Sequence, residues 1–215
     1  MDRGSEGIFR LAQLLVNLGP LGLVSLAMSR LASIRRYYLL AVNLSKINLP
    51  LGVMPSGDLA PLAADDIGPM LDQCRGMPLP DRVELLARIR FMENGPPGCH
   101  LLKSEGTTAY MQWLIRPEQN DLLLRNHAGR FSPLGRNQVM IENAFTFPNF
   151  RGRGLYQKCT GRLLLDAREQ GYASALCYIR VGNIVSLNET MSMGFRIRKL
   201  LTEYRLAGHI RRTGQ

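Results

Sequence analysis

The stretch Pro148–Tyr156 constrains the fold of this chain most, because it joins a strand pattern to a helix pattern through a glycine-containing loop. The preceding residues 138–147 are rich in strand-forming side chains and end at a proline. The following apolar side chains recur at helical spacing and are closed by a glycine that suits a helix end; they are Leu155, Cys159, Leu163 and Ala167, followed by Gly171. The sequence therefore predicts a strand, a loop and a helix in direct succession.

The loop has the features of an anion-binding site. A strand that turns into a helix leaves several backbone N–H groups without partners, and the helix dipole favours an anion beside them. Gly152 and Gly154 remove side chains that would keep a phosphate away from the backbone. Positive charge gathers on or near the loop, at Arg151, Arg153, Lys158 and Arg162. The alternative is a glycine-rich turn that only caps a helix.

The spacing of the loop excludes two common phosphate motifs and matches a third. It is neither the dinucleotide fingerprint nor the nucleoside-triphosphate loop. It resembles the acyl-CoA loop of the GCN5-related N-acetyltransferases, Gln/Arg-x-x-Gly-x-Gly/Ala, whose amides hold the pyrophosphate of coenzyme A. The residues that fit are Arg151, Gly152, Arg153, Gly154 and Leu155, while Tyr156 replaces the last small residue.

A second block of the chain matches the same family. There the family reads Asn-x-x-Ala/Ser-apolar and, after a short interval, Gly-Phe. The matching residues here are Asn183, Ser186, Leu187, Gly194 and Phe195. Between the two blocks, residues 173–179 form a buried-strand pattern. The resemblance covers the chain from about Val139 to Leu206.

The resemblance implies an α/β (α+β) fold, with a mixed, mostly antiparallel central sheet whose strands splay apart and are flanked by helices. We expect the acyltransferase domain at residues 57–215 and an N-terminal helical extension with a strand at residues 1–50. The Pro- and Gly-bearing stretch 45–57 is the expected linker.

The resemblance also implies acetyl-CoA, or another acyl-CoA, as the co-substrate. In this family the backbone of the strand before the loop binds the pantetheine arm as an added strand would. Phe145, Thr146 and Phe147 supply that backbone here, and Asn183 and Ser186 are the further residues expected at the cofactor. No metal is expected.

Glu142 is the expected general base, because it is a carboxylate in an otherwise apolar strand. Strict alternation places residues 140, 142, 144 and 146 on one face, and Val139, Ile141, Phe145 and Phe147 on the other. Partial burial would raise the pKa of Glu142 toward neutrality, which suits a base. The alternative is a glutamate paired with one of the arginines.

The acid that protonates the leaving thiolate is less clearly marked. The family often carries a tyrosine seven residues after the Asn of its second block, and Thr190 stands there in this chain. Tyr178 is the predicted substitute, with Tyr156, Tyr204 and solvent as alternatives.

The remaining elements are read from local patterns. A strand is expected at residues 36–44, helices are expected to begin near Asp66 and Asp81, and residues 98–115 read as a hairpin. Residues 66–97 are expected to line the acceptor site.

The formal net charge of +10 is compatible with nucleic acid, an anionic membrane or an anionic ligand. No nucleic-acid motif accompanies it, so no nucleic-acid partner is expected. The basic cluster in residues 148–168 suits the phosphates of a cofactor. A second cluster in residues 195–215 is either a solvated edge and tail or a surface for an acidic acyl carrier protein.

Residues 8–31 form an apolar helical pattern interrupted at Gly19-Pro20. Three readings stay open: packing on the core or on a second subunit of a homodimer, peripheral contact with a membrane surface, and a membrane span. The four cysteines have neither metal-ligand nor disulfide spacing, and Cys159 and Cys177 lie in apolar patterns as expected of buried thiols. A cytoplasmic protein fits, with peripheral membrane contact left open.

The sequence thus predicts an N-acyltransferase that moves an acetyl or other acyl group from acyl-CoA to the amine of a small molecule, such as an amino sugar. One alternative is a membrane-surface enzyme that uses a longer acyl-CoA or an acyl carrier protein. The other is a non-catalytic module that binds coenzyme A or a partner.

Overall fold

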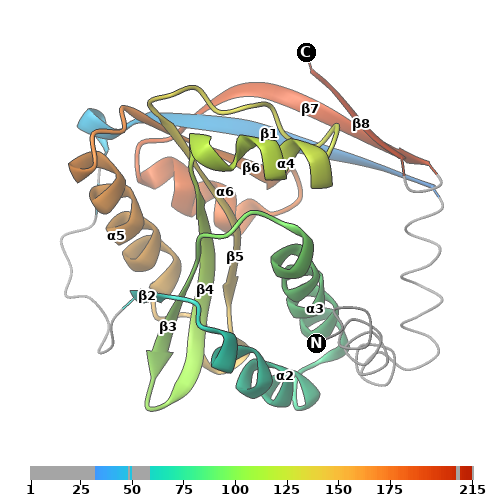
Figure 1. The fold of residues 1–215 in the computed structure, drawn as a ribbon, viewed down its shortest axis with the longest axis vertical. Helices are drawn as coiled ribbons and strands as arrows, with labels where there is room; N and C mark the ends of the chain where they lie inside the picture. The colour runs from blue at the N-terminus through green and yellow to red at the C-terminus, as the bar shows by residue number, and fades with distance from the viewer. Residues whose placement is uncertain (1–31, 48, 50–58, 207–208, 215) are drawn as a thin grey trace.

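A computed structural model of the protein describes residues 32–47, 49, 59–206 and 209–214 (Figure 1). These residues form one eight-stranded sheet in the order β2-β3-β4-β5-β6-β1-β7-β8. The strands are β1 (Ala32–Asn43), β2 (Leu59–Pro61), β3 (Cys99–Ser104), β4 (Thr107–Ile115), β5 (Gln138–Thr146), β6 (Ser174–Arg180), β7 (Arg196–Leu206) and β8 (His209–Gly214). The helices are α2 (Ile67–Arg75), α3 (Leu79–Asn94), α4 (Asn120–Asn126), α5 (Leu155–Glu169) and α6 (Ile184–Ser192).

The sheet is mixed and mostly antiparallel, as predicted. Only β5 and β6 run parallel, because α5 crosses over between them. The predicted hairpin is confirmed: β3 and β4 are joined by Glu105 and Gly106, which both have positive φ angles, of 52° and 73°. Two positive φ angles in a two-residue loop suit the right-handed twist of the strands.

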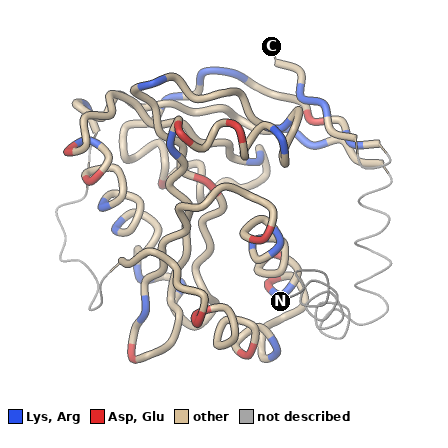
Figure 2. The backbone as a smooth tube through the Cα atoms, viewed as in Figure 1, with Lys and Arg blue, Asp and Glu red and all other residues tan. Residues whose placement is uncertain are grey.

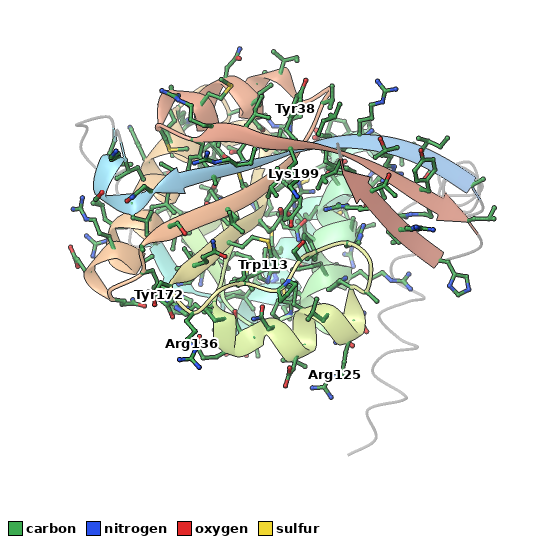
Figure 3. The ribbon with its side chains drawn as sticks, turned by 90° about the horizontal axis from the view of Figure 1, so that it is seen from above. Tyr38, Trp113, Arg125, Arg136, Tyr172 and Lys199 are labelled. Carbon is green, nitrogen blue, oxygen red and sulfur yellow. The ribbon has the colours of Figure 1, made fainter. Side chains whose placement is uncertain are left out.

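The strand β1 lies inside the sheet, although it comes first along the described chain. It pairs antiparallel with β6 on one side and with β7 on the other, and Figure 3 shows it between those strands. The strand predicted for the extension at residues 1–50 is therefore part of the same sheet as the strands of residues 57–215. Through this placement Tyr37 pairs with Arg180 on β6 and with Leu201 on β7.

Helices cover both faces of the sheet, and each face has its own core. On one face α2, α3 and α4 pack against β3, β4 and β5, around the buried Trp113 and Phe91, whose rings meet edge to face at 5.3 Å. On the other face α5 packs against β1, β5 and β6 through Leu163, Leu164 and Ala167. Figure 1 shows α5 and α3 on opposite sides of the central strands.

A β-bulge in β5 corrects the alternation expected from the sequence. Asn143 has a φ of 54°, and Asn143 and Ala144 together stand opposite Gln112 on β4. The extra residue reverses which side chains face each way. Phe145 and Phe147 pack with Met140 in the α3-side core, whereas Val139 and Ile141 pack in the α5-side core. The prediction that Phe145 and Phe147 share a face with Val139 and Ile141 was wrong.

The strands β5 and β6 splay apart, as predicted. Their pairing is confined to Gln138↔Ser174, Val139↔Ala175 and Met140↔Leu176. Beyond Met140, β5 has lost its partner on that side, and the two strands open around a cavity.

The C-terminal basic cluster is not simply a solvated tail. The β7–β8 hairpin forms the edge of the sheet, with Lys and Arg along it (Figure 2). Glu203 on β7 is completely buried and accepts hydrogen bonds from Arg212 (2.9 Å) and Arg205 (3.4 Å). Part of the cluster is therefore built into the interior beside the β5–β6 splay.

Two further predictions concern the cysteines and the apolar segment 8–31. All four cysteines are buried free thiols, which confirms the expectation for Cys159 and Cys177. The apolar segment 8–31 lies outside the described residues, so its three readings stay predictions. Within the described residues, no helix combines the length and the apolar character needed to cross a bilayer.

Candidate active site

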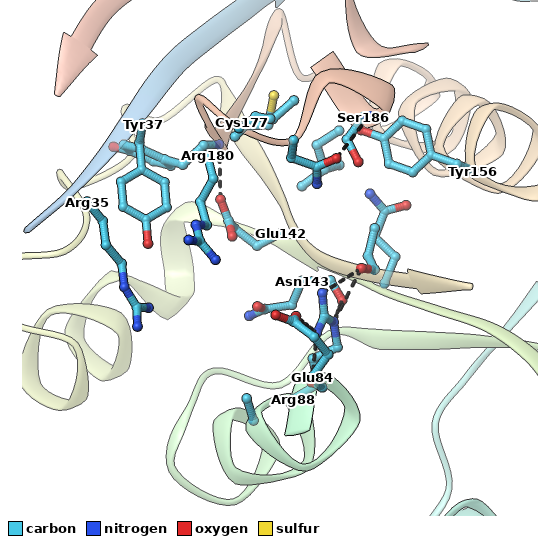
Figure 4. Close-up of a pocket in the computed structure, with 18 of the residues that line it drawn as sticks. Arg35, Tyr37, Glu84, Arg88, Glu142, Asn143, Tyr156, Cys177, Arg180 and Ser186 are labelled. Atoms are coloured by element: carbon cyan, nitrogen blue, oxygen red, sulfur yellow. Dashed lines mark hydrogen bonds and ion pairs between the residues drawn. The ribbon is translucent and has the colours of Figure 1, made fainter. Parts of the chain in front are cut away.

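The splay between β5 and β6 holds a cavity of about 620 Å³. Its walls come from β1, α3, β4, β5, β6 and the start of α6. In Figure 4, Glu142 lies between two ends of this cavity: Tyr156 and Ser186 mark one end, and Arg35 and Tyr37 mark the other. We call these the α6 end and the β1 end.

The Glu142 side chain connects β5 to β6 at the point where the two strands separate. Its Oε1 accepts a hydrogen bond of 3.0 Å from the backbone N–H of Tyr178 on β6, so the carboxylate is fixed in the cavity wall. Burial raises the pKa of Glu142 to about 7, and the positive charge of Arg212 opposes this rise. A carboxyl group with a pKa near neutrality can take up a proton and release it again under physiological conditions.

The bulge at Asn143 is held by an arginine from α3. The Arg88 guanidinium donates to the carbonyl oxygens of Asn143 (3.1 Å) and Ala144 (3.0 Å), and it pairs with Glu84 (2.7 Å). Backbone strain at a non-glycine residue with positive φ persists only where the surroundings hold it. Arg88 supplies that support, and it lines the cavity at the same time.

Gln112 on β4 presents an oriented amide to the cavity. Only 1% of this residue is exposed, and its Oε1 accepts hydrogen bonds from the hydroxyls of Tyr110 (2.8 Å) and Thr160 (2.9 Å). Both hydroxyl protons need an acceptor, so the carbonyl oxygen faces them and the NH₂ group is turned toward the cavity that Gln112 lines. No described residue accepts a hydrogen bond from this NH₂ group. Gln112 was not predicted from the sequence, although an amide among the apolar residues 109–115 is a signal of the same kind as Glu142.

The predicted phosphate loop has the expected backbone. Gly152 and Gly154 have φ angles of 75° and 68°, and α5 starts at Leu155 without a side-chain cap. Within the described chain, no hydrogen-bond acceptor serves the amides of residues 152–157. The loop therefore offers free N–H groups at the N-terminus of a 15-residue helix, which fits a phosphate.

The two loop arginines are occupied by neighbours. Arg151 pairs with Asp81 of α3 and donates from Nε to the Thr146 carbonyl (3.3 Å). Arg153 donates to the Asn149 carbonyl (3.1 Å) and lies over the Phe150 ring. The loop amides, rather than these guanidinium groups, are left unpartnered for an anion.

Tyr156 contacts Thr190, the residue that stands where the family often carries a tyrosine. Its hydroxyl lies 2.6 Å from Oγ1 of Thr190, which is completely buried. Burial raises the pKa of Tyr156 above its usual value, so this hydroxyl stays protonated at neutral pH. Tyr156 and Thr190 are the two residues that depart from the family pattern, and their side chains are hydrogen-bonded to each other at the α6 end.

Asn183 and Ser186 both line the α6 end of the cavity. Asn183 is the N-cap of α6, and its Oδ1 accepts from the Ser186 N–H (3.2 Å). Its side-chain NH₂ group is not used by that cap.

Tyr178 lines the cavity from β6, but its hydroxyl lies at the β1 end. That hydroxyl accepts a hydrogen bond of 3.4 Å from the Ser132 N–H, and its ring lies edge to face with Phe131 at 5.4 Å. The backbone of Tyr178 contacts Glu142, whereas its side chain points to a different neighbourhood from that of Tyr156.

The three residues expected to hold the pantetheine arm lie outside the lining of the cavity. The Phe147 amide already donates to the Ala109 carbonyl (3.0 Å), and the Thr146 carbonyl is used by Arg151. The Phe145 ring is buried beneath Arg88, 5.1 Å away. The bulge residues Asn143 and Ala144 line the splay instead.

The β1 end is formed by residues that the sequence analysis did not identify. Arg35 and Tyr37 come from β1, Arg130 from the segment after α4, and Arg180 from the end of β6. These side chains are brought together by strand pairing, so no local spacing announces them. The expected acceptor segment 66–97 does contribute, through Glu84 and Arg88.

Comparison with known proteins identifies the class of fold. No protein-family model and no curated protein matches the chain. Among solved structures, the chain is similar to a GCN5-related glucosamine N-acetyltransferase region of a fungal multi-domain GH3 beta-N-acetylglucosaminidase, with a TM-score of 0.57, 8% identity, and coverage of 91% of this chain and 23% of that one. It is also similar to a GNAT-family acetyltransferase from Colwellia psychrerythraea, with a TM-score of 0.52, 13% identity, and coverage of 86% of this chain and 62% of that one.

These matches define the class of fold. The chain has the fold of the GCN5-related N-acetyltransferases, as the two sequence blocks predicted. It spans less than two thirds of the length of both matched chains.

Proposed function

We propose that the protein is an N-acyltransferase that moves an acetyl or other acyl group from acyl-CoA to the amine of a small molecule. The observation that carries this proposal is the position of Glu142, which is fixed in the cavity between two splayed strands. Its pKa is raised to about 7 there. Support for the donor comes from the unpartnered amides of residues 152–157 and from the fold.

Glu142 removes a proton from the ammonium form of the acceptor, directly or through a water, so that the nitrogen lone pair is free to attack. The new C–N bond forms at the thioester carbonyl carbon while negative charge develops on the carbonyl oxygen. The Gln112 NH₂ group is oriented to donate to that oxygen, because its own carbonyl is held by two hydroxyls.

The C–S bond then breaks, and the leaving thiolate needs a proton. The geometry favours the Tyr156 hydroxyl as its source, since it is protonated, partnered with Thr190 and located at the α6 end. Tyr178, the donor predicted from the sequence, remains the competing candidate, and a pair of phenylalanine variants distinguishes the two. After transfer, Glu142 releases the ammonium proton to solvent. The second proton, which the nitrogen loses as the amide forms, replaces the one that Tyr156 gave to the thiolate.

The test is thermal stability with a ladder of donors: coenzyme A, acetyl-CoA, medium- and long-chain acyl-CoA, and an acylated carrier protein. A ligand that binds only the folded state raises the melting temperature, by about 2.7 kcal/mol of stability at a hundredfold excess over Kd. We expect a shift with acetyl-CoA and with coenzyme A. If only long-chain acyl-CoA or the carrier protein raises the melting temperature, that compound is the donor instead of acetyl-CoA.

Turnover is then followed as release of free thiol from the bound donor with primary amines. We expect thiol release that depends on both the amine and Glu142. No shift with any donor would refute the proposed function, while donor binding with no dependence on amine would leave a module that only binds coenzyme A.

A further inference from the structure

The β1 end of the cavity carries an excess of positive charge. Its lining includes Arg35, Arg130 and Arg180, and the carboxylates that line the whole cavity are Glu84 and Glu142. Glu84 is already paired with Arg88, and Glu142 is only partly ionised near neutrality because of its raised pKa. Three guanidinium groups therefore face a space in which they lack compensating charge.

Neither Arg35 nor Arg180 has a carboxylate within ion-pair distance among the described residues. Arg130 has a single such contact, at 4.0 Å from its Nε to Glu203. That Nε is buried and has no hydrogen-bond acceptor in the described structure. Burying a cation without a full set of acceptors is unfavourable, so an anion at this position would stabilise the arrangement.

Glu203 cannot neutralise the group, because it is shared among three arginines. It accepts from Arg212 and Arg205 at hydrogen-bond distance, and Arg130 is the most distant of the three. Burial, together with the charges of Arg205 and Arg212, lowers the pKa of Arg130 despite Glu203. One carboxylate thus stands against several buried positive charges.

A second hollow of about 380 Å³ adjoins this end and is also basic. It shares Arg130 and Tyr178 with the first cavity and adds Lys199 and Arg212, and no carboxylate lines it. Arg212 is held in place by aromatic rings, with its guanidinium 4.3 Å from the Tyr37 ring centroid and 5.0 Å from that of Tyr178. The positive charge around Arg130 is therefore fixed in position before any ligand arrives.

The phosphates of a donor do not account for this charge. The loop whose free amides suit them begins α5, and Tyr156 of that helix marks the α6 end, opposite Arg35 in Figure 4. The arginines lie instead on the other side of Glu142 from that helix, with Arg35 at the β1 end in Figure 4.

From these observations we propose that the acceptor is a small amine that also carries an anionic group, a carboxylate in the simplest case, and that Arg35, Arg130 and Arg180 bind that group. This inference rests on the proposed function. The acceptor nitrogen would lie at Glu142 and its anionic group at the β1 end, as in an α-amino acid or another short amino acid. Arginine suits this role because its planar fork can bind both oxygens of a carboxylate.

The same charge would assist the chemistry. Guanidinium groups close to an amine disfavour its ammonium form, so less of the acceptor has to be deprotonated by Glu142. An acceptor amine that carries no anionic group would leave the positive charge of the arginines uncompensated. We therefore expect selectivity for anionic amines to be expressed in KM as well as in kcat.

The test compares acceptors that differ only in charge. The standard L-α-amino acids are assayed against their carboxamides with acetyl-CoA by thiol release, and phosphoethanolamine is assayed against ethanolamine to separate a carboxylate from a phosphate. We expect at least one acid to exceed its amide by about tenfold or more in kcat/KM, the usual effect of a charge-assisted contact.

Arg35→Gln and Arg180→Gln are the informative variants, because neither side chain has an ion pair in the described structure that its loss would break. Each should reduce kcat/KM for the preferred anionic amine by about tenfold and leave the KM for acetyl-CoA unchanged. Arg168→Gln is the matched control: it removes the same charge from an exposed position on α5 that does not line the cavity.

The failures of this inference and of the proposed function are distinct. A neutral amide acetylated as fast as its acid would leave the function standing and overturn the inference. If no compound in the panel is acetylated, the melting temperature of the coenzyme A complex is measured with each acid and with its amide. A rise with an acid that its amide does not produce supports the inference. Equal rises with acid and amide overturn it. Absence of a shift with every donor refutes the proposed function.

Discussion

The two ends of the cavity were assembled from the sequence in different ways. The α6 end comes from two segments, the loop with the start of α5 and the N-cap of α6, and each is marked by a local sequence pattern. The β1 end comes from β1, β6 and the segment after α4, which meet only through strand pairing. The first end depends on backbone geometry, which requires particular residues such as Gly152 and Asn183. The second depends on side chains whose proximity exists only in the folded sheet.

The two ends should also respond differently to substitution. Residues at the α6 end should affect every acyl transfer, whatever the acceptor. Residues at the β1 end should distinguish one acceptor from another. Glu142 and Gln112 lie between them and should affect the chemical step itself.

The largest effect is expected from Glu142→Gln. The amide keeps the size of the side chain and an oxygen that can accept from the Tyr178 N–H, but it cannot take a proton. We expect kcat to fall by about 10²–10⁴-fold, with donor affinity retained. In the unmodified protein kcat/KM should fall as pH drops through about 7, where the carboxylate is protonated, and the variant should lack that limb.

The same substitution has a stability signature. The folded state binds the Glu142 proton more tightly than the unfolded state does, so stability is lost as pH rises from about 4.5 through about 7. Glu142→Gln should therefore have the higher melting temperature at pH 8, with the difference gone near pH 4. Glu105→Gln in the exposed β3–β4 turn is the control. Full turnover of Glu142→Gln at pH 8 would eliminate the assigned base.

The next effect is expected from Gln112→Leu, which removes the oriented NH₂ group. We expect kcat to fall by about 10²–10³-fold with every acceptor, as is usual for the loss of one donor to a developing oxyanion. Thr160→Val is the matched control, because it removes one hydrogen bond to Gln112 but leaves the NH₂ group in place. Equal losses of kcat in both variants would mean that Gln112 acts only through packing.

The tyrosines test the two ends directly. Tyr156→Phe should lower kcat by about tenfold for all acceptors, since it removes the proposed proton source at the α6 end. Tyr178→Phe should have a smaller effect on kcat, because its hydroxyl contacts Ser132 at the β1 end. The rates of each variant are measured with acyl donors whose leaving thiols differ in pKa. A variant that has lost the general acid depends more strongly on that pKa. The reverse order of effects would favour Tyr178, as first predicted from the sequence.

The smallest effect is expected from Gly152→Ala. A Cβ at this position would contact nothing within 4 Å in the protein, so the cost to stability is that of a positive φ, about 1 kcal/mol. The methyl group would instead crowd a phosphate, raising the KM for acetyl-CoA by several-fold. Gly106→Ala in the β3–β4 turn has the same open surroundings and a φ of 73°, so it should lose similar stability without affecting the donor.

Much of the fold could be predicted because its signals are local. The hairpin turn at Glu105-Gly106, the loop glycines and the Asn183 cap each need a residue type that the sequence displays. Glu142 could also be predicted, since a carboxylate in an apolar strand is conspicuous.

What could not be predicted depends on one extra residue and on pairing at long range. The bulge at Asn143 inverts the faces of Phe145 and Phe147, and a strict alternation of two residues cannot reveal it. Arg212 contacts Tyr37 only because β8, β7 and β1 lie side by side in the sheet. The basic character of the β1 end is therefore a property of the assembled sheet.

The position of β1 has a further consequence for how the chain reaches its native state. This strand is synthesised before β6 and β7, yet it must pair with both, through contacts such as Tyr37↔Arg180 and Tyr37↔Leu201. Until those strands leave the ribosome, both edges of β1 remain open to other chains, and the large loop that its pairing closes slows folding. The strand that carries Arg35 and Tyr37 into the cavity is thus also the one whose delayed pairing exposes the nascent chain to aggregation.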